Sequence, residues 1–215
     1  MKKTALVIGA TGLVGSEVLH QLLADDGYSR VRVFHRRSTG IDHPKLEEHI
    51  VDFDTIDSWK QLISGDELYS ALGTTIKKAG SQEKQYTVDY TYQFEVANAA
   101  AENGVKKYSL VSSAGADHRS KVFYSRLKGE LDDDVKELPF EFITIMRPSI
   151  LDGERNESRP TESIGKFFMQ FLTKLPGLKK YRPIPGKTVA KAMINSLHKC
   201  PEGYHVFELD EIFLL

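Results

Sequence analysis

The chain has 215 residues, with 29 lysines and arginines, 30 aspartates and glutamates, and a formal net charge of −1. This balance leaves no overall field that would draw nucleic acid or an anionic membrane to the protein. The single cysteine, Cys200, excludes an internal disulfide, and no His/Cys cluster indicates a zinc finger. No apolar run approaches the roughly 20 residues of a membrane helix, and the N-terminal apolar run is too short for a signal peptide. We therefore expect a soluble protein of the reducing cytoplasm, a monomer or homodimer, with no nucleic-acid or membrane partner.

Strand-like and helical segments alternate along the chain, which is typical of βαβ units and a parallel sheet. Strands are predicted at residues 4–8, 31–34, 49–51, 67–72, 108–112 and 142–146, with a seventh candidate at 205–209. Helices are predicted after the first strand, near 55–63, over 81–103 and over 123–138. Proline, glycine and charge concentrate between residues 148 and 187. The expected fold is a single Rossmann-like α/β domain over 1–215. Its doubly wound, mostly parallel sheet should carry helices on both faces and a small C-terminal substrate elaboration at about 150–187.

A glycine-rich turn directly follows the first predicted strand. Gly9, Gly12 and Gly15 stand at three-residue spacing between that strand and an amphipathic helix. In such a turn the first glycine permits the tight bend, the second lets backbone approach a pyrophosphate, and the third lets helix and strand pack closely. The helix N-terminus adds unpaired N–H groups and a partial positive charge. Glycines also mark ordinary turns, but this position between strand and helix favours a dinucleotide-binding site.

Residues at the ends of the next strands are candidates for cofactor contacts, because ligands of doubly wound sheets bind beyond the carboxyl ends of the strands. Arg36 and Arg37 follow the second strand, where no acidic residue stands to accept from a ribose 2′-hydroxyl. Two guanidinium groups suit the 2′-phosphate of NADP, so NADP is expected in preference to NAD; the alternative is an exposed basic turn. Turn chemistry would equally explain the further candidates at the ends of the third and fourth strands, which are Asp52, Phe53, Leu72, Gly73 and Thr74.

A tyrosine and a lysine form the second constellation. Tyr124 and Lys128 stand four residues apart on a predicted helix, so they share one face and lie one turn apart. A nearby ammonium group favours the phenolate, and such a tyrosine can exchange a proton with a carbonyl oxygen. Ser112 and Ser113, at the end of the fifth strand, could hydrogen-bond the same oxygen. Tyr-x-x-x-Lys alone is often an ordinary exposed pair, but its place downstream of a dinucleotide turn favours a catalytic reading.

Together these motifs resemble the short-chain dehydrogenase/reductase superfamily in its atypical branch, within the group of the Tat-interacting tumour suppressor and its bacterial relatives. The resemblance runs in chain order over nearly the whole sequence, as far as Glu157-Ser-Arg-Pro160. It implies a Rossmann-like fold with bound NADPH, Tyr124 as the proton acceptor, Lys128 on the nicotinamide ribose, and Ser113 as the serine, with Ser112 as the alternative. The cofactor contacts that the resemblance implies are Thr11, Gly12, Leu13, Val14, Arg36, Arg37, Leu72, Gly73, Thr74, Leu151 and Arg159.

Some features depart from that group or carry no chemistry of their own. Asp89 stands where many extended members have an asparagine that helps to hold a proton-relay water; a carboxylate cannot donate that hydrogen bond. The segment 150–187 is shorter than the sugar-binding lobe of the epimerase relatives, so a nucleotide-sugar substrate is not expected. An apolar helical stripe at 164–175 predicts packing or a lid, and the acidic run at 132–134 predicts a solvated face. The scattered histidines show no metal-ligand spacing, so no metal is expected.

Two functions fit these observations. The first is an NADPH-dependent oxidoreductase that acts on a small carbonyl or alcohol substrate through a serine, Tyr124 and Lys128, with the cofactor carrying the redox chemistry. The second is a regulatory or sensor protein that binds NADPH and a protein partner with little or no turnover. Turnover of a carbonyl panel that stops in Tyr124→Phe would favour the enzyme, and NADPH-dependent partner binding without turnover would favour the sensor.

Overall fold

The computed structural model describes residues 2–152 and 179–215, and their centre is a seven-stranded sheet. The strand order is β3-β2-β1-β4-β5-β6-β9, and every neighbouring pair is parallel. This order reverses direction between β1 and β4, as in doubly wound dinucleotide-binding folds. The strands are β1 Lys3–Ile8, β2 Tyr28–His35, β3 Leu46–Ile50, β4 Glu67–Ser70, β5 Lys107–Val111, β6 Phe142–Arg147 and β9 Gly203–Glu208; β7 Leu151–Asp152 and β8 Ile184–Pro185 form a separate parallel pair.

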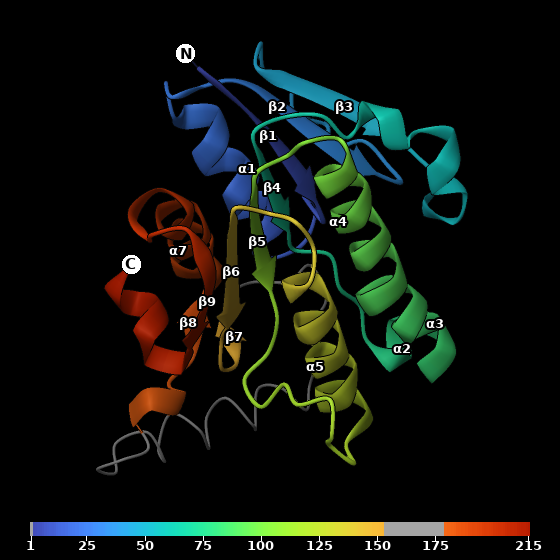
Figure 1. The fold of residues 1–215 in the computed structure, drawn as a ribbon, viewed down its shortest axis with the longest axis vertical. Coiled ribbons are helices and arrows are strands. Elements are labelled where there is room, and N and C mark those ends of the chain that lie inside the picture. Colours follow the sequence, from blue (N-terminus) through green and yellow to red (C-terminus); the bar gives the residue numbers. More distant parts are fainter. Residues whose placement is uncertain (1, 153–178) are drawn as a thin grey trace.

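Helices cover both faces of the sheet (Figure 1). On one face lie α1 and α7, and on the other lie α4 and α5. The helices are α1 Gly15–Ala24, α2 Ile76–Ala79, α3 Gln82–Tyr86, α4 Tyr92–Glu102, α5 Phe123–Lys136 and α7 Gly186–Lys199; shorter helical turns are η1 Phe53–Ser58, η2 Lys60–Leu62, η3 Thr87–Thr91, η4 Lys179–Tyr181 and η5 Leu209–Leu214. The expected Rossmann-like α/β fold is confirmed. None of the helices in the described ranges is long and apolar enough to cross a membrane.

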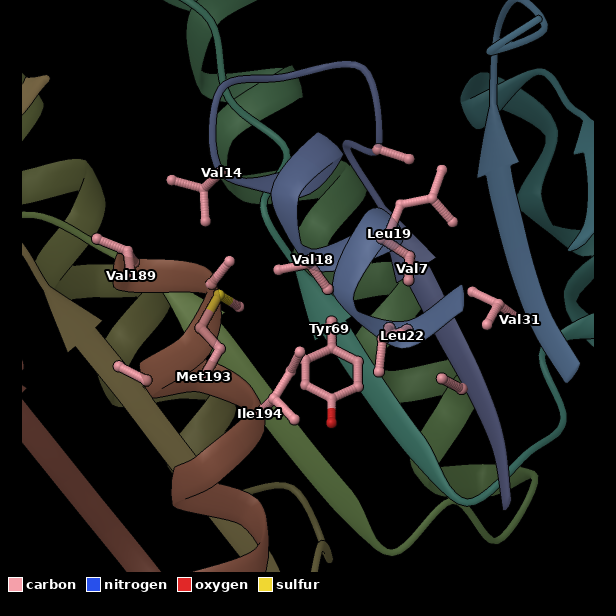
Figure 2. Close-up of a cluster of buried hydrophobic side chains, with 14 of the residues drawn as sticks. Val7, Val14, Val18, Leu19, Leu22, Val31, Tyr69, Val189, Met193 and Ile194 are labelled. Carbon is pink, nitrogen blue, oxygen red and sulfur yellow. The ribbon is translucent and has the colours of Figure 1, made fainter. Parts of the chain in front are cut away.

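Two hydrophobic cores follow from the pleat of β1. Successive strand side chains point to opposite faces, so Val7 packs with α1 and α7 while Leu6 packs with α4 and α5. Figure 2 shows the first core, in which Val18 of α1 and Met193 of α7 meet over the sheet. Because both faces of β1 are covered, its buried part, Ala5–Ile8, is continuously apolar rather than alternating.

A buried polar network lies at the amino-terminal edge of the sheet. The Glu67 carboxylate is fully buried and accepts hydrogen bonds from Lys3 Nζ (2.9 Å), Tyr28 OH (2.5 Å) and Tyr69 OH (2.8 Å). His198 Nε2, near the end of α7, lies 3.0 Å from Glu67 Oε1. Burial alone would raise the pKa of Glu67, but the partners His198, Tyr28 and Lys3 outweigh it and lower the pKa to about 2.

The structure differs from the sequence prediction in three elements. The segment expected to be one helix at 55–63 is a pair of 3-10 turns, η1 and η2. The long helix expected over 81–103 is divided into α3, the π-helical turn η3 and α4. Helix α7 was not predicted from the sequence. The apolar stripe expected at 164–175 lies outside the described residues.

Candidate functional site

A cleft of about 1190 Å³ opens at the carboxyl ends of the strands, where the strand order reverses. It brings together segments far apart in sequence: the turn after β1, the loop after β4, the end of β5, one face of α5 and the start of α7. Ten of the predicted site residues line it, namely Thr11, Gly12, Leu13, Val14, Leu72, Gly73, Thr74, Tyr124, Lys128 and Leu151.

The three glycines of the first turn have different surroundings. Gly9 has a positive φ of 79°, and a Cβ on it would lie 2.4 Å from the Ala71 carbonyl oxygen. A Cβ on Gly15 would lie 2.1 Å from the Gly9 oxygen, so these two glycines shape the turn. Gly12 is different, because it lines the cleft and a Cβ there would meet the Gly9 oxygen at 3.2 Å. Within the described chain α1 starts without a side-chain cap, which leaves N–H groups for an anion. A turn of this shape fits a pyrophosphate.

The first residue of helix α7 packs directly against the glycine-rich turn. A Cβ on Gly186, its first residue, would lie 2.7 Å from the Leu13 carbonyl oxygen, so only glycine allows the helix to come this close. The next residue, Lys187, lines the cleft, and its carbonyl accepts a hydrogen bond from Gln21 Nε2 of α1 (3.2 Å). The C-terminal part of the chain therefore contributes directly to the glycine-rich turn.

Tyr124 and Lys128 lie one turn apart on α5 and both line the cleft. The Tyr124 side chain is 40% exposed, whereas Lys128 is 3% exposed, so the phenol faces the opening and the ammonium lies deeper. Gly129 lets the loop before α5 pack against the helix, because a Cβ there would lie 2.2 Å from the His118 nitrogen. The structure thus places Tyr124 and Lys128 in the same cleft as the glycine-rich turn after β1.

The two candidate serines have different environments. Ser112 is buried, lines the cleft, and donates from Oγ to Asp132 Oδ2 at 2.9 Å. Ser113 Oγ lies 3.4 Å from the Ala114 carbonyl oxygen, and Ser113 is not among the described residues that line the cleft.

The prediction of a solvated acidic face at 132–134 is wrong for Asp132, while Asp133 and Asp134 are exposed as predicted. Asp132 is fully buried, and Arg147 Nε also donates to its Oδ2 at 2.9 Å. Burial raises the pKa of Asp132, although Ser112 and Arg147 oppose that shift. The signal was present in the sequence, because Asp132 follows Lys128 by four residues and therefore shares its inward face.

The other predicted residues lie outside the lining of the cleft. Arg36 and Arg37 are exposed in the bend after β2. The Asp52 side chain caps η1 by accepting from the Asp54 N–H (3.0 Å), and Phe53 is buried in the second core. Arg159 lies outside the described residues.

The loop after the two arginines is tied to β3. Glu48 accepts hydrogen bonds from Ser38 Oγ (2.7 Å) and from the Thr39 N–H (2.7 Å). Burial would raise the pKa of Glu48, but these donors and His35 lower it below its usual value. The Glu48 carboxylate therefore holds the backbone of the loop that directly follows the two arginines.

Comparison with known proteins agrees with this geometry. An NAD(P)H-binding family model matches residues 9–199. "Protein fmp52, mitochondrial" of Emericella nidulans is 38% identical over 207 residues, which cover 92% of this chain and 88% of that protein. "Protein HTATIP2" of Rattus norvegicus is 32% identical over 200 residues, which cover 91% and 81%.

Solved structures share the fold at low sequence identity. The Bordetella bronchiseptica enzyme WbmH, in complex with NAD+, superposes with a TM-score of 0.72 at 19% identity, over 96% of this chain and 76% of that one. A short-chain dehydrogenase/reductase superfamily protein from Agrobacterium tumefaciens, with bound NAD, gives 0.72 at 17% identity over 96% and 77%.

These comparisons correct one expectation and establish another. The predicted cytoplasmic location is wrong by this comparison, since the fungal relatives carry "mitochondrial" in their names. The net charge and the short N-terminal apolar run, on which that expectation rested, do not determine the compartment of a protein. The matched family model, the relatives and the shared fold agree with the glycine turn at the strand reversal: the chain belongs to the NAD(P)H-binding family, and it shares its fold with solved members of the short-chain dehydrogenase/reductase superfamily.

Proposed function

We propose that this protein is an NADPH-dependent oxidoreductase that acts on a small carbonyl or alcohol substrate. The observation that carries the proposal is the shared cleft: Gly12 of the glycine-rich turn lines the same cleft as Tyr124 and Lys128. A nucleotide-binding turn alone would serve a sensor equally well. A tyrosine and a buried lysine beside it add the groups that proton transfer to a carbonyl requires.

The residues divide the work as follows. The N-terminus of α1 would hold the pyrophosphate, for which Gly12 leaves room because it has no side chain, and Arg36 and Arg37 would hold the 2′-phosphate. When bound, NADPH supplies the hydride that reduces the carbonyl carbon. The Tyr124 phenol would give its proton to the carbonyl oxygen, which completes the alcohol, and a proton from solvent would then restore the phenol. Lys128, one turn further along α5 and in the lining of the same cleft, would hold the nicotinamide ribose.

The expectation of NADPH rests on charge. Arg36 and Arg37 directly follow β2 and are exposed, and Glu48, which fixes the next residues of the loop, accepts hydrogen bonds from Ser38 and Thr39. A 2′-phosphate would meet two permanent cations with fork geometry there. NADH lacks that phosphate and would gain nothing from them.

A pair of tyrosine variants tests the proposal. NADPH oxidation is followed at 340 nm (the absorbance of the reduced nicotinamide) against a panel of aldehydes and ketones, for the wild type and Tyr124→Phe. We expect Tyr124→Phe to lose about 100-fold or more in kcat while NADPH binding measured by calorimetry is unchanged. Tyr181→Phe is the matched control, since Tyr181 is 38% exposed and is not among the described lining residues.

Two results would contradict the enzyme. Equal turnover by wild type and Tyr124→Phe would remove Tyr124 from the reaction. Tight NADPH binding with no turnover of any panel compound, together with NADPH-dependent binding of a protein partner, would favour the sensor instead.

A further inference from the structure

Asp89 is a buried carboxylate in the wall of the cleft that the proposed reaction does not use. It is 1% exposed and lies in η3, the π-helical turn that interrupts the helix expected over 81–103. π-helical turns occur mostly as short insertions, and they are frequent at functional sites. A charged group at this depth requires partners, and the identity of those partners indicates what it does.

The Asp89 carboxylate grips the backbone of the loop after β4. Its Oδ1 accepts from the Thr74 N–H at 2.6 Å. Its Oδ2 accepts from Gln85 Nε2 at 3.0 Å, and the same Gln85 nitrogen lies 3.4 Å from the Thr74 carbonyl oxygen. A Cβ on Gly73 would lie 3.3 Å from Asp89 Oδ1, so the loop lies directly against the carboxylate. The Thr74 N–H is therefore held by Asp89 of η3, and the Thr74 carbonyl oxygen by Gln85 of α3.

The other end of Asp89 is tied to the strand from which this loop starts. Its main-chain carbonyl accepts from Gln93 Nε2 at 2.7 Å, and Gln93 Oε1 accepts from Ser70 Oγ at 2.7 Å. Ser70 is the last residue of β4, and Gln93 and Ser70 are fully buried. The clamp thus spans β4, η3 and the loop, and the hydrogen bonds behind it, from Gln85 and Gln93 to Asp89 and from Ser70 to Gln93, are buried, which fixes the carboxylate that holds the loop.

The position of the loop relates this clamp to one half of the cofactor. A dinucleotide crosses the reversal point between β1 and β4. Arg36 and Arg37 follow β2, so the adenosine half, with its 2′-phosphate, belongs on that side of the turn. The nicotinamide half then belongs on the side of β4, where Thr74 lines the cleft.

We propose that Asp89 is a positioning residue: through Thr74 it holds the loop after β4 in the shape that receives the nicotinamide half of the cofactor. This rests on the proposed use of NADPH for its orientation in the cleft. It does not rest on turnover, because its test is a binding measurement.

The test compares two ligands on three proteins. Dissociation constants for NADPH and for 2′,5′-ADP, which carries only the adenosine half, are measured by calorimetry for wild type, Asp89→Ala and Asp89→Asn. We expect Asp89→Ala to bind NADPH about tenfold more weakly, the loss of one charge-assisted hydrogen bond, and to bind 2′,5′-ADP like the wild type. Asp89→Asn keeps an oxygen for the Thr74 N–H, and Gln85 can turn its amide to accept from the new nitrogen, so it should restore most of the NADPH affinity.

Controls separate this role from general stability. Asp26→Ala removes a carboxylate that is 98% exposed and should change neither constant. An equal loss for both ligands in Asp89→Ala would overturn the proposal, as would unchanged NADPH binding or an Asp89→Asn variant as weak as Asp89→Ala. If no compound of the carbonyl panel is turned over, the dissociation constants can still be measured. The proposed reaction and the proposed role of Asp89 are therefore tested independently.

One measurement needs no variant to fold. Hydrogen exchange of the Thr74 amide in the ligand-free wild type should be slow, because its N–H donates to a buried carboxylate. Exchange at the rate of an open loop would overturn the clamp.

Discussion

Because Glu67 is buried in a network of hydrogen bonds, we expect the unfolding free energy of this protein to fall at acidic pH. A single substitution at Glu67 measures how much of that fall this carboxylate causes. Glu67→Gln keeps the size of the side chain and removes its charge. The pKa of the wild-type carboxyl is about 2 in the folded protein, against 4.5 for the ordinary group. Since the folded pKa is the lower one, the stabilisation is fully present above pH 4.5 and is lost as the pH falls toward 2.

The size of the effect follows from the shift. At about 1.36 kcal/mol per pKa unit, the charged form of Glu67 contributes about 3 kcal/mol at pH 7. At pH 3 the folded protein still ionises this group but the unfolded chain does not, and about 1.5 kcal/mol remains. These figures describe the dependence on pH, and the cost of burying the carboxylate is common to both conditions.

Urea unfolding of both proteins at pH 7 and pH 3 measures this quantity. The difference in unfolding free energy between wild type and Glu67→Gln should shrink by about 1.5–2 kcal/mol at the lower pH. Glu141→Gln is the matched control, because Glu141 pairs with Lys106 at 2.6 Å but is exposed, and a surface pair contributes little. A wild-type advantage of the same size at both pH values would refute the reasoning.

Three further predictions concern the cleft and its supports. Gly12→Val should fold and lose NADPH binding, because its side chain would occupy the pyrophosphate position; calorimetry showing normal affinity would remove the cofactor assignment. Arg36→Ala or Arg37→Ala should cost NADPH about 10- to 100-fold in affinity and leave NADH unchanged, with the preference weakening as salt rises; an unaltered ratio of dissociation constants in both variants would make the arginines a solvated turn. Gly129→Ala should lower the unfolding free energy by about 1–3 kcal/mol, since the new methyl group meets backbone at 2.2 Å; thermal unfolding at the wild-type midpoint would contradict this packing.

Periodicity and turn chemistry were enough to predict the sheet. The continuous apolar run of β1 could only be a strand covered on both faces, and the glycine turn after it located the reversal point. The cleft could likewise be anticipated, because parallel strands bring their carboxyl ends to one edge. The predicted turn residues, Tyr124 and Lys128 therefore lie around one cavity although more than 100 residues separate them.

What the sequence could not show depends on partners distant in the chain. The helical spacing from Lys128 indicates that Asp132 faces inward, but its partner Arg147 lies at the end of β6, and the sequence alone did not bring the two together. The π-helical turn at Asp89 was missed because a continuous helical pattern does not reveal one extra residue per turn. Helix α7 was missed because its glycine start has meaning only against Leu13, far away in sequence. In each case a tertiary contact overrides the local pattern.

Helix α7 also sets the order in which this protein can become functional during synthesis. The glycine turn is made well before the surface on which it rests, because Gly186 and the apolar face of α7 come much later in the chain. Until α7 has been made, Val18 and Leu22 of α1 lack the α7 side chains that complete their core. In an incomplete chain these apolar residues are exposed, and such surface is what chaperones bind. Premature termination before residue 186 therefore yields a polypeptide that contains the whole fingerprint motif and yet lacks a finished nucleotide site.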